Sequence, residues 1–261
     1  EDQWELITGN SMTIDHSAVI DHLSQDIGIS KTVDDVTVTV DSATAGRDCF
    51  YVLVRVDGLE FKSKHGYDFR DVSLTLNPTP DSALTGYGME YWGIDDDKRA
   101  VFLLDYSYSG AEYLDLISQN IQVDLSLEDI LQDGHTDKTK TLKEASWYFS
   151  FILDYQKAFD TMTLPDINAT QDGSDKITKL TNIELTNTGI HYQYVMDDMD
   201  NLPSFEIRAI MKNRASIDLA SGIGTPTDDN KEMVMSYVWR VPIKINELDY
   251  IQIGGQQITV K

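Results

Sequence analysis

The sequence predicts an all-β protein made of two tandem immunoglobulin-like β-sandwiches, with a short N-terminal helical segment before the first. Three observations support this prediction. Apolar and polar residues alternate with a period of two in many short segments, turn residues separate these segments, and no stretch carries a long helical repeat. With 261 residues, 41% of them hydrophobic, the chain is long enough for two such domains.

The first series of strands lies before residue 157. Residues 36–40 and 72–76 alternate strictly, and residues 50–56 are β-branched or aromatic except for one Leu and one Arg. The turn cluster Asp95-Asp96-Asp97-Lys98 is typical of a strand connection. The same patterns predict four further strands, at residues 88–92, 101–108, 121–127 and 147–153.

A second series of strands follows residues 156–175, a segment with Leu164-Pro165 and a polar run that suggests a crossing point between domains. We therefore expect an N-terminal sandwich in residues 1–157 and a C-terminal immunoglobulin-like sandwich in residues 158–261. The strands of the second domain are predicted at residues 179–186, 189–195, 205–211, 232–241, 250–253 and 257–260.

Helix is expected only in short pieces. Residues 17–25 carry four apolar side chains after Ser17, a candidate N-cap, and Gly28 is a candidate end for this helix. Shorter helical turns are predicted at residues 111–118 and 127–132. None of these is long enough to be an architectural element.

The charge of the chain excludes two classes of partner. It has 44 Asp and Glu against 21 Lys and Arg, a net charge of −23, which repels both nucleic acid and anionic lipid. Residues 1–157 carry 29 acidic and 12 basic residues and residues 158–261 carry 15 and 9, so the first domain is the more acidic. No window resembles a membrane-spanning helix.

The sequence shows no constellation typical of catalysis or metal binding. It has no Gly-x-Ser-x-Gly, His-Glu-x-x-His or Cys-x-x-Cys motif, and Cys49 precedes an apolar run as a small strand residue would. Asp166-x-Asn168-x-Thr170 begins like an EF-hand loop, but Gln171 and Ile177 replace its Gly and its final Glu. We therefore expect no enzyme activity, no catalytic residue, no cofactor and no metal site.

Aromatic side chains are the remaining candidates for a ligand site. Tyr87, Tyr91 and Trp92 lie close together at the strand predicted for residues 88–92 and are a candidate stacking platform for a sugar. The competing interpretation is that these rings belong to cross-strand pairs or to the core. A hydrolase with two catalytic carboxylates also stays open, because the separation of two acids is not visible in a sequence.

Three segments resemble a known bacterial family. Residues 33–43, which read VDDVTVTVDSA, and the following FYVLVRV at residues 50–56 resemble the opening of the domain-of-unknown-function family 4179. The first domain closes on WYFSFILDY at residues 147–155 in a similar way. Residues 242–260, PIKINELDYIQIGGQQITV, resemble the terminal strand pair of the sandwich domain that often follows it.

The resemblance implies a Gram-positive membrane protein with a short cytoplasmic region, one transmembrane helix and this extracytoplasmic part, some members being similar to anti-sigma factors. It implies no catalytic residues. Because the chain starts at Glu1 without an initiator Met or a signal sequence, we expect a fragment that lacks its N-terminal membrane anchor.

The leading hypothesis is a non-enzymatic sensory or interaction module at the extracytoplasmic face of the cell membrane. It would belong to a membrane-anchored, anti-sigma-factor-like regulator and bind an unknown protein or cell-envelope ligand. Its contact with the membrane would be only through a transmembrane helix absent from this chain. The alternative is a cell-surface carbohydrate-binding or adhesive β-sandwich module.

Overall fold

The structure is a computed structural model, and it describes residues 25–46, 49–77, 84–109, 120–134, 138–154, 161–196, 202–227 and 231–260. Most of these residues form antiparallel β-strands, so the prediction of an all-β protein is confirmed. Within the described ranges the one helical element is η2, a 3-10 turn at Ile245–Glu247. No helix in these ranges is long and apolar enough to cross a membrane.

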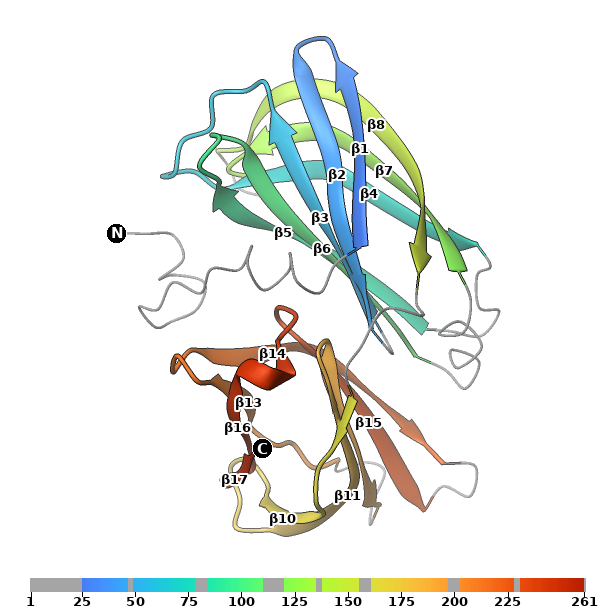
Figure 1. Cartoon of the computed structure of the whole chain (residues 1–261), viewed down its shortest axis with the longest axis vertical. Helices are drawn as coiled ribbons and strands as arrows, with labels where there is room; N and C mark the ends of the chain where they lie inside the picture. The colour runs from blue at the N-terminus through green and yellow to red at the C-terminus, as the bar shows by residue number, and fades with distance from the viewer. Residues whose placement is uncertain are drawn as a thin grey trace.

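Strands β1 to β8 form the N-terminal unit, the upper part of Figure 1. A five-stranded sheet with the order β1-β2-β3-β6-β5 faces a three-stranded sheet with the order β4-β7-β8 in a sandwich-like arrangement. The strands are β1 (Gln25–Val33), β2 (Val36–Ala45), β3 (Cys49–Asp57), β4 (Tyr67–Asn77), β5 (Leu84–Ile94), β6 (Ala100–Ser109), β7 (Asn120–Gln132) and β8 (Lys140–Asp154).

Strands β9 to β17 form the C-terminal unit, the lower part of Figure 1. They make one nine-stranded sheet with the order β10-β11-β12-β15-β14-β13-β16-β17, and β9 pairs with β11. The sheet curls so that its two end strands, β10 and β17, approach each other. There the Thr170 N–H donates to the Gly254 carbonyl oxygen at 3.0 Å. The strands are β9 (Thr161–Thr163), β10 (Ile167–Thr170), β11 (Ile177–Thr186), β12 (Gly189–Val195), β13 (Ile207–Met211), β14 (Ser216–Pro226), β15 (Glu232–Trp239), β16 (Leu248–Ile253) and β17 (Gln256–Thr259).

The period of two in the sequence explains how each unit fills its core. In β8, the side chains of Trp147, Phe149 and Phe151 are buried between the two sheets, whereas the intervening Tyr148 and Ile152 are exposed. Alternate residues of β2, β3, β6 and β7 complete this cluster from the other strands. Each strand predicted from the sequence overlaps a strand of the structure.

None of the three predicted helices is present among the described residues. Residues 17–24 and 111–118 lie outside the described residues, whereas Gln25 already begins β1 and Gly28 lies at a bulge in it, with φ +63°. Residues 127–132 belong to β7 and are not helical. Bulges opposite β8 make Leu127, Ile130 and Leu131 all buried, and this spacing imitates a helical face.

The expected crossing segment also contains strands. Residues 161–163 and 167–170 are β9 and β10, which extend the C-terminal sheet at β11. Strand β14 was not predicted, because Gly222, Gly224 and Pro226 lower its strand propensity. A Cβ on Gly222 would come within 2.1 Å of the Tyr237 ring, so the glycine makes room for that ring across the β14–β15 pair.

A buried seam joins the two units. We define it as the outward side chains of Cys49, Tyr51, Leu53, Trp92 and Leu103, which belong to the same apolar cluster as the core of the C-terminal unit. Strand β3 is therefore covered on both faces, since its other side chains face the N-terminal core. Such burial is typical of a fixed contact.

Hydrogen bonds fix the geometry of the seam at Trp239, the last residue of β15. The Tyr51 hydroxyl donates to the Trp239 carbonyl oxygen at 2.5 Å, and burial raises the pKa of Tyr51 well above its ordinary value, so the donor keeps its proton. The Trp239 indole Nε1 donates to the Thr186 carbonyl oxygen at 3.3 Å. The buried Trp239 therefore accepts a hydrogen bond from the N-terminal unit and donates one within the C-terminal unit.

Close backbone approach and an ion pair flank these hydrogen bonds. A Cβ on Gly46 would lie 1.8 Å from Thr188 Oγ1, so a larger residue at position 46 would push the units apart. On the side of β5, Arg240 Nη2 lies 2.8 Å from Glu90 Oε1. The seam thus combines an apolar centre with polar contacts at its edge.

We predict that Tyr51→Phe lowers the free energy of unfolding by about 1–3 kcal/mol, because it removes the donor from a buried carbonyl oxygen without changing the packing volume. Urea unfolding followed by tryptophan fluorescence measures this loss. The matched control is Tyr148→Phe on the exposed face of β8, for which the change is expected to stay within about 0.5 kcal/mol. Equal effects of the two substitutions would contradict a stabilising role of the Tyr51 hydroxyl.

Candidate functional site

The three aromatic residues singled out in the sequence do not share one exposed surface. Tyr87 is 48% exposed, stacks on Tyr106 with ring centroids 6.4 Å apart, and donates its hydroxyl to the Val72 carbonyl oxygen at 2.8 Å. Trp92 is 5% exposed and lies in the seam. Trp92 belongs to the cluster of the seam whereas Tyr91 packs against the cluster of the N-terminal core, so the two rings lie on opposite faces of the sheet.

Tyr91 packs toward the core of the N-terminal unit. Its ring lies 5.2 Å from that of Tyr67 and 5.6 Å from that of Phe102, measured between centroids. Burial, and then the neighbouring Tyr67, raise the pKa of Tyr91. Tyr87 therefore lies at the edge of the sheet, Tyr91 faces the N-terminal core and Trp92 lies in the seam. This placement agrees with the competing interpretation, that the rings belong to cross-strand pairs or to the core.

Two acids of the turn Asp95–Asp97 pair with arginine. Arg99 Nη2 lies 2.8 Å from Asp95 Oδ2 and also 2.8 Å from Asp97 Oδ2, and Arg55 Nε lies 3.6 Å from Asp95 Oδ2. Asp166, from the segment similar to an EF-hand loop, pairs with Lys179 at 2.9 Å across the β10–β11 hairpin. In the part of the chain that the structure describes, no group of three or more His, Cys, Asp or Glu residues could hold a metal ion.

Cys49 is a buried thiol of the seam. Its side chain is 1% exposed, and its Sγ lies 3.9 Å from the Thr188 carbonyl oxygen. This environment excludes solvent from the sulfur. Its position agrees with the prediction that Cys49 is a small strand residue.

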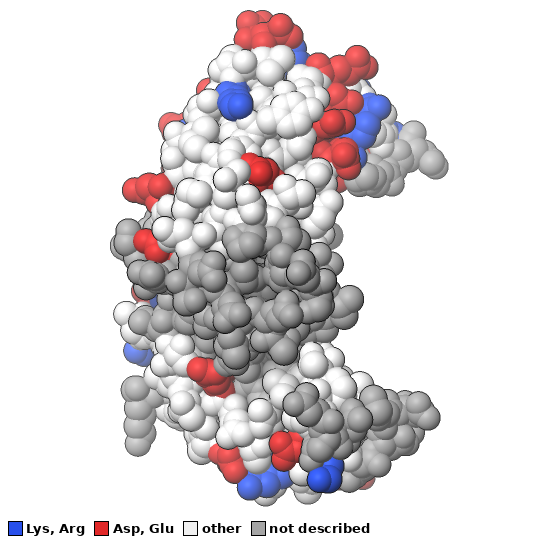
Figure 2. Space-filling model, turned by 90° about the vertical axis from the view of Figure 1, so that its right-hand side faces the viewer, with Lys and Arg blue, Asp and Glu red and all other residues white. Residues whose placement is uncertain are grey.

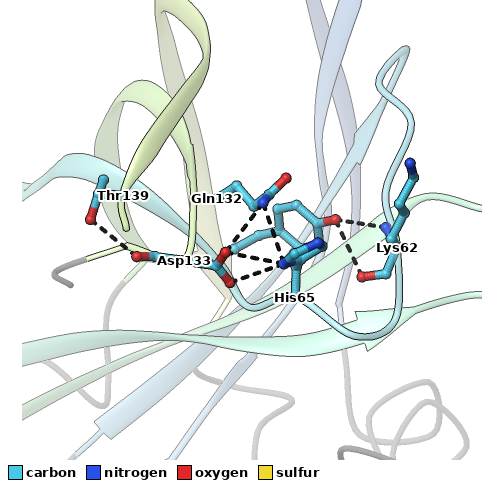
Figure 3. Close-up of polar contacts among 6 residues, drawn as sticks. Lys62, His65, Gln132, Asp133 and Thr139 are labelled. Atoms are coloured by element: carbon cyan, nitrogen blue, oxygen red, sulfur yellow. Dashed lines mark hydrogen bonds and ion pairs between the residues drawn. The ribbon is translucent and has the colours of Figure 1, made fainter. Parts of the chain in front are cut away.

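His65 and Asp133 form a polar cluster that the sequence did not reveal (Figure 3). His65 Nδ1 lies 3.0 Å from Asp133 Oδ2, and the Gln132 side-chain amide donates to the same oxygen at 3.2 Å. The hydrogen bond from Gln132 is the main cause that lowers the pKa of Asp133, with His65 as a further cause. The Asp133 N–H donates to the Gly66 carbonyl oxygen at 2.9 Å.

The cluster fixes the connection between β3 and β4 to the end of β7. Thr139 donates its hydroxyl to the Asp133 carbonyl oxygen at 3.0 Å, and the Lys62 N–H donates to the Tyr67 hydroxyl at 2.6 Å (Figure 3). We therefore interpret it as a structural contact.

A concave surface lies on the outer face of the three-stranded sheet. We call it the β4–β7–β8 recess; its volume is about 440 Å³. Backbone pairing brings its side chains together in two rungs across the sheet, Ser73–Ser126–Tyr148 and Thr75–Asp124–Ser150. Lys31 of β1 lines it at the side.

The recess has a polar rim on a rigid base. Leu125 and Phe149, which also line it, are 1% and 3% exposed and belong to the core beneath. Hydrogen bonds from Ser150 and Gln122 lower the pKa of Asp124, and the Gln122 amide donates to its two oxygens at 3.0 and 3.2 Å. Asp124 is therefore an ionised hydrogen-bond acceptor at neutral pH.

A third acid with a shifted pKa, Asp105, lies beside the seam. Asp105 of β6 pairs with Tyr51 on one side and Gly88 on the other, so it lies on the sheet face that is turned to the C-terminal unit. Burial, and then the charge of Glu90, raise the pKa of Asp105. Its ionised form is therefore less favourable in the folded protein than in the unfolded chain.

Together the fold and these sites define an all-β protein of antiparallel sheets with a polar surface recess. No family model and no curated protein matches the sequence. The structure is similar to the crystal structure of a conserved domain protein from Bacillus anthracis, with a TM-score of 0.52 and 11% sequence identity. The match covers 97% of this chain and 83% of that chain, and at this identity it establishes a likeness of fold alone.

We predict that Asp105→Asn raises the melting temperature at neutral pH, because it removes an unfavourable charge from a half-buried side chain. A raised pKa means that the folded protein holds more protons than the unfolded chain between the ordinary and the raised pKa, so stability falls as the pH rises through this window. The gain from Asp105→Asn should disappear below about pH 4, where the acid is protonated in both states.

Melting curves of Asp105→Asn and of the unchanged protein, recorded as a function of pH, test this prediction. Asp97→Asn is the matched control, because Asp97 lies in an exposed turn. A loss of stability for Asp105→Asn at neutral pH would contradict the proposed environment of Asp105.

Proposed function

We propose that this chain is a non-enzymatic extracytoplasmic interaction module of a membrane-anchored, anti-sigma-factor-like regulator. We further propose that its two units are tandem immunoglobulin-like domains, residues 1–157 and 158–261. The resemblance of three sequence segments to family 4179 and its companion domain supports this proposal. The all-β fold is compatible with it, since sandwich domains are common in cell-surface proteins.

The observation that carries the proposal is the buried seam. Two units joined by an apolar contact and a hydrogen bond at Trp239 respond as one body to a ligand bound on either of them. A regulator that reports an external signal needs such a connection, because binding must favour one state of the whole assembly over another. Independent binding domains on a flexible linker would not need it.

The recess supports binding rather than hydrolysis. A glycosidase needs two carboxyl groups about 5–9.5 Å apart across the scissile bond. Among the described residues that line the recess, Asp124 is the one acid, and Lys31 is the one basic residue. The polar groups there are mostly hydroxyls, which suit recognition of a cell-envelope ligand.

The proposal predicts where this part of the protein lies in the cell. In the natural host, the complete gene product tagged after Lys261 should fractionate with membranes, and protease added to intact protoplasts should remove the tag. A tagged cytoplasmic enzyme in the same cells is the control and should be cleaved only after lysis. Recovery of the tag in the cytosol, or its protection in intact protoplasts, would overturn the extracytoplasmic assignment.

A further inference from the structure

We propose that the β4–β7–β8 recess binds a neutral oligosaccharide, with Tyr148 stacking on a pyranose ring and Asp124 and the neighbouring hydroxyls bonding its hydroxyl groups. This inference rests on the proposed role as an interaction module and adds the chemical class of its ligand. It concerns a different surface from Tyr87, Tyr91 and Trp92.

The aromatic contribution comes from Tyr148. It is 58% exposed in the middle of β8, although its neighbours Trp147 and Phe149 are buried. Ile152, 47% exposed, extends the apolar surface along the same face of the strand. A pyranose ring has one face made mainly of C–H groups, and an exposed aromatic side chain offers a complementary apolar surface.

The polar contribution comes from the two rungs beside this ring. The hydroxyls of Ser73, Thr75 and Ser126 make no hydrogen bond to the described residues, and each can both donate and accept. Asp124, held by Gln122 and Ser150, can accept from two adjacent hydroxyls of a sugar through its two oxygens. This pattern matches the dense, alternating donors and acceptors of a saccharide.

The charge of the recess selects a neutral ligand. Lys31 and Asp124 are its one basic and one acidic residue among the described lining, so they balance, and the chain as a whole carries a net charge of −23. Phosphorylated, sulfated or uronic-acid polymers would be repelled by this overall charge. Figure 2 shows the side of the molecule on which β8 lies in Figure 1, and acidic side chains there gather mainly at the margins of a largely uncharged upper surface.

The size and rigidity of the recess fit a ligand of a few sugar rings. Its volume of about 440 Å³ lies within the usual range for small-ligand sites, about 300–1,000 Å³. Its side chains project from three hydrogen-bonded strands whose opposite face is the packed core. Little conformational entropy would therefore be lost by the protein on binding.

The test is a titration of the ¹⁵N-labelled chain with three tetrasaccharides at about 5 mM, which detects dissociation constants in the millimolar range. The probes are β-1,4-linked glucose, β-1,4-linked N-acetylglucosamine and α-1,4-linked glucose. We expect at least one to shift amide resonances of β4, β7 and β8, whereas a sulfated tetrasaccharide should not. Absence of shifts with all three neutral probes, or stronger binding of the sulfated one, would overturn the inference.

Substitutions then assign the binding to the recess. Tyr148→Ala should weaken the affinity for the bound tetrasaccharide at least about tenfold, and Asp124→Asn should weaken it several-fold. The control Ile177→Ala removes an exposed apolar side chain of the C-terminal unit and should leave the affinity unchanged. Unchanged affinity of Tyr148→Ala with an unchanged melting temperature would refute the site.

The outcome is separate from that of the protoplast experiment. If the tag is accessible outside the cell but no neutral probe binds, the ligand class is wrong while the proposed localisation stands. If a probe binds at the recess but the tag is cytosolic, the saccharide site stands and the regulatory role fails.

Discussion

The contact of Tyr51 with Trp239 is the constraint on which the arrangement of the molecule depends. It requires β3 to be apolar on both faces, with one face in the N-terminal core and the other in the seam. It also requires Gly46 beside Thr188, because a side chain there would separate the units. Two sheets that could have been joined only by a linker are instead held by a common apolar cluster.

The seam also determines which surface is left for a ligand. The five-stranded sheet turns its outer face to the C-terminal unit, so side chains such as that of Trp92 are buried and are not accessible to a ligand. On the outer face of the three-stranded sheet Tyr148 and Ile152 are exposed, and there the strand period places hydroxyls and Tyr148 in adjacent rungs. The division between a structural face and a binding face thus follows from which sheet makes the seam.

The sequence predicted local structure well and distant contacts poorly, for a physical reason. Alternation shows which residues of a strand share a face, and the strands at residues 36–40 and 189–195 were predicted on that basis. It cannot show that the outer face of β3 meets Trp239, 188 positions from Tyr51, nor that His65 meets Asp133. The recess was missed for the same reason, because its two rungs combine single hydroxyls from three strands.

The central claim is that the seam makes the two units one rigid body. Residual dipolar couplings of backbone amides in a weakly aligned sample test it most directly, with alignment tensors fitted separately to β1–β8 and β9–β17. We predict that the two tensors agree in magnitude and orientation for the unchanged chain, and that they diverge for Gly46→Val, which forces a side chain against Thr188. Different tensors for the two units of the unchanged chain would contradict the claim.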